Sequence, residues 1–127
     1  MDAIVDSAVV RALNEELGAE RAGALGASYL ATLEERVYHL RAALAAFDSN
    51  RAVIALRGLR SASELVGARA LATAVAEIEP AVRAGRYAPA RSALPEIMQL
   101  AAATTRELSD LLNASTRDGS RLRAPSR

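Results

Sequence analysis

The sequence contains no cysteine and no tryptophan, and its 127 residues include only one phenylalanine and three tyrosines. The lack of cysteine excludes both a disulfide framework and a thiolate metal site. No apolar run approaches the roughly 20 residues of a membrane span, and the acidic, polar first residues do not resemble a signal peptide. We therefore expect a cytoplasmic protein without a membrane partner.

Aliphatic residues take the place of the missing aromatic ones. Hydrophobic residues make up 51% of the chain, and most of them are alanine, leucine and valine. Such side chains suit close helix packing better than a sandwich of β-branched and aromatic strands. No segment alternates like a strand, and the length supports one domain with one core. The composition therefore predicts an all-α domain.

The basic residues are all arginine, and they are unevenly distributed. The net charge is only +1, yet the segment 117–127 holds four arginines against one aspartate. We interpret residues 114–127 as a disordered, Arg/Ser-rich tail that follows a folded domain at 1–113. The alternative for this tail is an electrostatic contact with nucleic acid or acidic lipid. Nucleic acid is not the partner we expect.

The apolar residues recur at alternating spacings of three and four, which predicts amphipathic helices. Capping residues and breakers divide this pattern into five helices at about 7–17, 19–47, 51–66, 68–80 and 89–112. Pro80 is expected to kink or end the fourth helix, because proline lacks an amide donor and crowds the preceding turn. Pro95 is expected to divide the fifth near its beginning. The layout predicts an antiparallel four-helix bundle with a short additional N-terminal helix.

One stretch of the third helix carries a motif. Residues 56–68 read LRGLRSASELVGA, which resembles the active-site helix of the histidine phosphotransfer (HPt) family, with its pattern AHxLKGSAxxLGA. Leu59, Gly67 and Ala68 coincide with family positions, and Arg60 stands where the family has lysine. The resemblance extends over about 6–112. It implies a small helix covering the end of a bundle, and a surface that receiver domains of response regulators dock on.

The motif departs from the family at two positions. The phosphorylatable histidine falls on Arg57, and the glycine four residues later falls on Ser61, which is still small. A neutral imidazole has a lone pair that accepts a phosphoryl group, whereas a guanidinium stays protonated and offers only donors. Arg57 therefore is not expected to relay phosphate. The single histidine, His39, is expected to be exposed beside Glu35, with a displaced phosphoacceptor as the alternative.

The helical period separates the third helix into an inner and an outer side. The inner side, which should face the core, holds Ala52, Leu56, Leu59, Ser63 and Val66. The outer side holds the candidate partner-binding residues Arg57, Arg60, Ser61 and Glu64. Ile54 and Leu65 lie near Gly58 and Ser61. They form either an apolar rim around Arg57 or a surface that a neighbouring helix partly covers.

These observations lead to a hypothesis of a pseudo-HPt protein. It would bind a receiver domain, or another protein of a sensor-kinase system, as a competitor or modulator that carries no phosphoryl group. The alternative is a helical scaffold or homodimer that uses the Ile54–Leu65 rim or the alanine-rich fifth helix. An enzyme is not expected, because the sequence shows no acid–base pair, phosphate loop or metal cluster. No cofactor and no metal are predicted.

Overall fold

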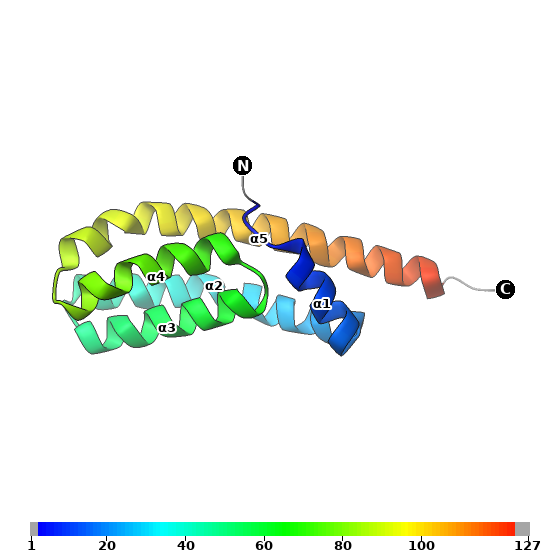
Figure 1. Ribbon diagram of the computed structural model, residues 1–127, viewed down its shortest axis with the longest axis horizontal. Helices are drawn as coiled ribbons and strands as arrows, with labels where there is room; N and C mark the ends of the chain where they lie inside the picture. Colours follow the sequence, from blue (N-terminus) through cyan, green and yellow to red (C-terminus); the bar gives the residue numbers. More distant parts are fainter. Residues whose placement is uncertain (1–2, 124–127) are drawn as a thin grey trace.

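The computed structural model describes residues 3–123, with the side chains of residues 3–114. This part of the chain contains five helices and no strand: α1 Ser7–Leu17, α2 Ala19–Ala45, α3 Ser49–Leu65, α4 Arg69–Arg83 and α5 Tyr87–Arg123. In Figure 1, α2 to α5 run alongside one another in alternating directions, and α1 lies across one end of the bundle. The predicted all-α fold, an antiparallel four-helix bundle with a short N-terminal helix, is confirmed.

The predicted helix ends depend on two aspartates and a glycine. Asp6 Oδ1 accepts the backbone N–H of Ala8 at 3.0 Å, and Asp48 Oδ1 accepts that of Arg51 at 3.1 Å. Each bond satisfies an amide that the first helical turn leaves without a partner. The first helix ends before Gly18, whose φ of 86° is accessible to glycine at little cost. Local sequence therefore sets where α1, α2 and α3 begin.

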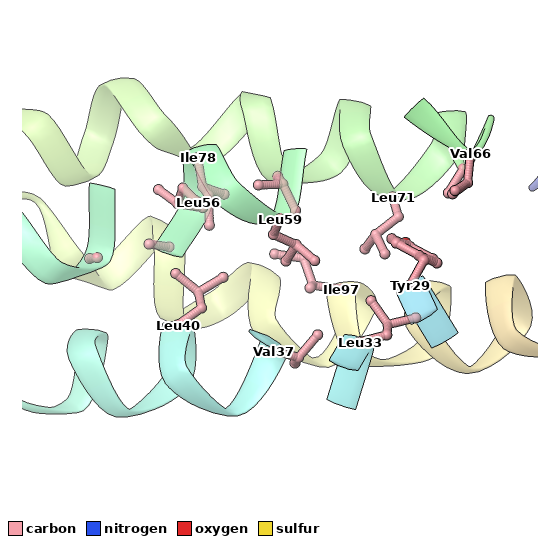
Figure 2. Packing of buried hydrophobic residues seen from close by; sticks show 14 of the residues in the cluster. Tyr29, Leu33, Val37, Leu40, Leu56, Leu59, Val66, Leu71, Ile78 and Ile97 are labelled. Atoms are coloured by element: carbon pink, nitrogen blue, oxygen red, sulfur yellow. The ribbon is translucent and has the colours of Figure 1, made fainter. Parts of the chain in front are cut away.

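The core lies along the axis of the bundle. Figure 2 shows that it is filled by side chains from α2, α3, α4 and α5. Of the residues expected to face inward from the third helix, all are buried: Ala52, Leu56, Leu59, Ser63 and Val66. Ser63 is the polar member, and its Oγ lies 2.8 Å from the buried hydroxyl of Tyr29. One hydroxyl donates to the other, so both buried groups have the hydrogen-bond partner that burial requires.

The fourth helix does not end at Pro80. Pro80 lies within α4, which continues to Arg83, so the expectation that this residue terminates the helix is wrong. Continuation places Val82 in the core, where it is fully buried, and its carbonyl accepts a hydrogen bond from Ser49 Oγ at 3.0 Å. Burial of an aliphatic side chain contributes about 1.5–3 kcal/mol, which offsets the backbone hydrogen bond that proline cannot make.

The fifth helix is longer than the sequence pattern indicates. It continues past Leu112 to Arg123, with Pro95 inside it. In Figure 1 its C-terminal part extends beyond the ends of α3 and α4. The expected boundary between a 1–113 domain and a 114–127 tail therefore falls within α5. The last four residues and the side chains of the tail arginines lie outside the described residues, so the division into domain and tail stays a prediction.

The turn between α3 and α4 is attached to the N-terminal segment. Gly67 has a φ of 80°, and its carbonyl accepts the backbone N–H of Asp6 at 2.7 Å. The Asp6 carboxylate in turn lies 2.8 Å from an Nη atom of Arg69 at the start of α4. These contacts fix the C-terminal end of α3, the helix that carries the candidate site.

The opposite end of the bundle is closed around Phe47. This residue follows α2 and has a φ of 54°, a conformation that is costly for a bulky side chain. The Arg91 guanidinium stacks on its ring at 4.5 Å, and an Nη atom of Arg91 donates to the carbonyls of Leu44 and Ala45. The ring of Tyr87 packs edge-on against it, with centroids 5.2 Å apart. These contacts from α5 offset the strain of the turn that precedes α3.

Candidate functional site

The outward face of α3 has a central stripe formed by Ile54, Gly58, Ser61 and Leu65. Ile54 is 72% exposed and Leu65 is 52% exposed, so no neighbouring helix covers either side chain. The sequence allowed either an apolar rim or a surface partly covered by a neighbouring helix, and in the structure both side chains are exposed. They are eleven positions apart, or about 16 Å along the helix axis. They therefore flank the stripe at its two ends and do not form one compact patch.

Arg57 lies beside this stripe, on the side that faces α4. Its side chain is 63% exposed, and its Nε is 3.8 Å from Oε2 of Glu79. Arg83 Nε donates to the same oxygen at 2.8 Å. Glu79 is only 18% exposed, so one mostly buried carboxylate lies between two arginines. Glu79 belongs to α4, so the acid beside Arg57 comes from a neighbouring helix and not from α3 itself.

Glu64 has a different partner. Arg60 Nε donates to Glu64 Oε1 at 3.0 Å, and both side chains are exposed. An exposed pair one helical turn apart contributes about 0.3–0.5 kcal/mol. The outer face thus carries the charges of Arg57, Arg60 and Glu64 along one border. A partner would meet two arginines there and a single exposed carboxylate.

Glu79 is held in its ionised form by these arginines. The hydrogen bond from Arg83 is the main cause that lowers its pKa, and the positive charges of Arg83, Arg57 and Arg60 act in the same direction. Partial burial raises the pKa and opposes them. The net effect is a lowered pKa, so the Glu79 carboxylate stays ionised at a lower pH than an ordinary glutamate does. At neutral pH, Arg57 therefore faces an ionised carboxylate on α4.

This pKa shift predicts a pH-dependent contribution to stability. Because the pKa of Glu79 is lower in the folded state, its ionised form stabilises the fold above the ordinary value of 4.5. That stabilisation declines as the pH falls through the lowered pKa. We expect Glu79→Gln to reduce the free energy of unfolding by no more than about 1 kcal/mol near neutral pH, and by less in acid. Urea denaturation of both proteins across this pH range measures the difference.

Glu77→Gln is the matched control, because Glu77 is exposed on the same helix and has no ion pair within the described part of the chain. It should leave the free energy of unfolding nearly unchanged at every pH. If the difference in free energy of unfolding between the wild type and Glu79→Gln stays constant into acid, the predicted dependence on the ionisation of Glu79 is contradicted.

The other border of the stripe faces α2. A Cβ placed on Gly58 would lie 3.3 Å from an Nη atom of Arg36, so glycine leaves room for that guanidinium. A groove of about 690 Å³ runs between the two helices, and its lining includes Arg36, His39, Ile54 and Gly58. His39 is exposed, and its Nε2 is 3.8 Å from Glu35 Oε1, as expected of a solvated histidine.

Sequence reasoning missed the residues that neighbouring helices contribute. The spacing of Glu79 and Arg83 predicts that they pair with each other on one helix. Nothing in the sequence indicates that this pair faces Arg57, or that Arg36 faces Gly58, because both depend on how α2 and α4 rotate against α3. The seven candidate residues themselves share the accessible side of α3, with Gly58 partly covered.

The described part of the chain offers little for metal or membrane chemistry. Among its residues, no group of three or more His, Asp or Glu side chains could hold a metal ion. Nor does it contain a helix that is both long and apolar enough to cross a membrane.

The fold is that of a histidine-containing phosphotransfer protein. The crystal structure of one such protein, HptB from Pseudomonas aeruginosa PAO1, superposes with a TM-score of 0.82 at 22% sequence identity. The match covers 90% of this chain and 98% of that chain. No family model matches the sequence, and no curated protein matches it either. The structural similarity confirms an HPt-like fold for this chain.

Proposed function

We propose that this protein is a pseudo-HPt module. In the cytoplasm it binds a response-regulator receiver domain, or another protein of a sensor-kinase system, and it carries no phosphoryl group. One observation supports this most directly. Arg57 stands where the resembling motif has its phosphorylatable histidine, and 63% of its side chain is exposed on an HPt-like bundle. The position thus has the accessibility of a docking residue and lacks a nucleophile.

The contacts of Arg57 leave it able to bind a second acid. Its distance of 3.8 Å from Glu79 exceeds that of a hydrogen bond. Its side chain makes no hydrogen bond within the described part of the chain, so the donors of the guanidinium are open to a partner. Receiver domains, as a family, hold an aspartate and further acids in one pocket. We infer that Arg57 enters this pocket as a permanent cation and takes the place of a phosphoacceptor.

The surrounding stripe has the properties of a docking surface. Ser61 is small and exposed one turn after Arg57, so it leaves space for an approaching backbone. Ile54 and Leu65 expose apolar side chains at the two ends, where a partner would bury them and gain from their removal from water. Arg60 and Glu64 supply charges on the border. A protein bound here would exclude a true phosphotransfer protein from the same receiver, which makes the module a competitor or modulator.

The test is a binding measurement with purified receiver domains and sensor-kinase domains from the source organism. Isothermal titration should show micromolar or tighter binding of the wild type to at least one of them. Arg57→Glu should weaken this binding by at least about tenfold, because a charge-assisted contact contributes about 1.5–3 kcal/mol and the reversed charge repels the acidic pocket.

Arg106→Glu provides the control for this substitution. Arg106 is exposed on α5, so the variant makes the same charge change on a helix other than α3. It should bind like the wild type. If the wild type and Arg57→Glu bind every tested domain with equal affinity, the role of Arg57 is contradicted. If the wild type binds none of the tested domains, the proposed function itself is contradicted.

A further inference from the structure

A second apolar surface lies between α2 and α5, on different helices from the Arg57 border. Tyr38 is 63% exposed and Met98 is 44% exposed, although both are large hydrophobic residues. They line a groove of about 470 Å³ together with Leu33 and Val37 of α2 and Ala101 of α5. Exposed apolar surface gathered in a groove is typical of an interaction site.

Two opposite charges line the same groove. Glu34 and Arg41 belong to its lining and lie four positions before and three positions after Tyr38 on α2. They are seven residues apart, so they lie on one face of the helix with about 10 Å between them along the axis. This separation prevents them from pairing with each other. Neither has an ion-pair partner within the described part of the chain.

The arrangement is complementary to itself under a two-fold rotation. If a second α2 packs antiparallel with its centre opposite residues 37 and 38, Glu34 of each copy faces Arg41 of the other. The two Tyr38 side chains then meet near the centre. Ala31 and Ala45 lie seven residues to either side of Tyr38 and are exposed, so no bulky side chain on this line of α2 obstructs the contact on either side of the tyrosines.

We propose that a second copy of this chain occupies the α2–α5 groove and forms a two-fold symmetric dimer. Self-complementarity favours this occupant, because an unrelated partner does not require opposite charges placed evenly about a centre. This surface also differs from the Ile54–Leu65 rim of α3. The dimer leaves Arg57 accessible, and the inference stands independently of the proposed receiver binding.

A charge-exchange experiment tests the dimer. Sedimentation equilibrium of the full chain should show a concentration-dependent dimer. Glu34→Arg alone places two arginines opposite each other at both contacts, and Arg41→Glu alone places two glutamates there. Each variant should associate about tenfold more weakly than the wild type, since two attractive contacts become repulsive.

Mixing the two variants in equal amounts provides the decisive measurement. In a mixed dimer, both contacts again pair a positive with a negative side chain, so association should return toward the wild-type level. Glu77→Arg, which reverses an exposed charge on α4 away from the groove, should associate like the wild type. A wild type that stays monomeric at its highest soluble concentration, single variants that associate like the wild type, or a mixture no stronger than its components would each overturn the proposal. Circular dichroism confirms that the surface variants are folded.

Discussion

Replacement of Gly67 by alanine is expected to lower the free energy of unfolding by about 3 kcal/mol. Two physical causes act at this position. The φ of 80° lies in the left-handed region, which an alanine adopts only at a cost of about 1 kcal/mol or more. A Cβ would also lie 2.9 Å from the carbonyl oxygen of Asp6 and 2.9 Å from Cβ of Val9. Both neighbours belong to the N-terminal segment, so this segment must move away from the α3–α4 turn.

Two other glycines separate these causes. Gly85 has a φ of 75°, and a methyl group added there would have no atom within 4 Å, so Gly85→Ala measures the backbone cost alone. Gly23 lies in α2 with equally open surroundings, and Gly23→Ala should stabilise the protein by up to about 1 kcal/mol. Urea denaturation followed by circular dichroism ranks the three variants. A loss at Gly67 no greater than that at Gly85 would show that the close approach of α1 has no energetic consequence.

Gly67 also illustrates what the sequence predicts about the fold. The motif assigns a glycine to this position, and the end of the helical pattern predicts a turn there. The caps at Asp6 and Asp48 are likewise predictable, because they depend on residues within three positions along the chain. The contact of Gly67 with Asp6 and Val9 is not, since it depends on the path of α1 across the bundle. Local signals thus set the helix ends, and tertiary packing gives them their energetic importance.

The same distinction applies to the candidate site. The period of 3.6 residues per turn places Arg57, Ser61 and Leu65 on the outer side of α3 without any structure. It does not reveal the neighbour of Arg57, because Glu79 comes from α4 and its approach depends on the rotation of that helix. At Pro80, in contrast, a prediction from local sequence was wrong because tertiary packing decided the outcome. A local rule allows α4 to end at this proline, but the helix continues to Arg83 and buries Val82 in the core.

The substitution Arg57→His is expected to give the protein a phosphoacceptor. Incubated with a receiver domain that carries an aspartyl phosphate, this variant should acquire a phosphoryl label that is stable in base and labile in acid. The lone pair of the new imidazole forms an N–P bond as the P–O bond to the aspartyl carboxylate breaks, and the ring releases a proton to solvent. The position offers exposure and the positive charge of Arg60 one turn away. The nearby carboxylate of Glu79 can accept a hydrogen bond from the ring and orient it.

The histidine already present makes the wild type an informative control for this experiment. The wild type contains His39 and should remain unlabelled, while a double variant Arg57→His/His39→Ala should be labelled like Arg57→His. Label on the wild type that disappears in His39→Ala would instead assign the relay to α2 and contradict a module that carries no phosphate. No label on Arg57→His from a receiver that binds it would show that exposure and an adjacent cation are insufficient. Arg57→His/Ser61→Gly tests one steric cause, because it should gain the label if the hydroxymethyl group of Ser61 keeps the aspartyl phosphate from the ring.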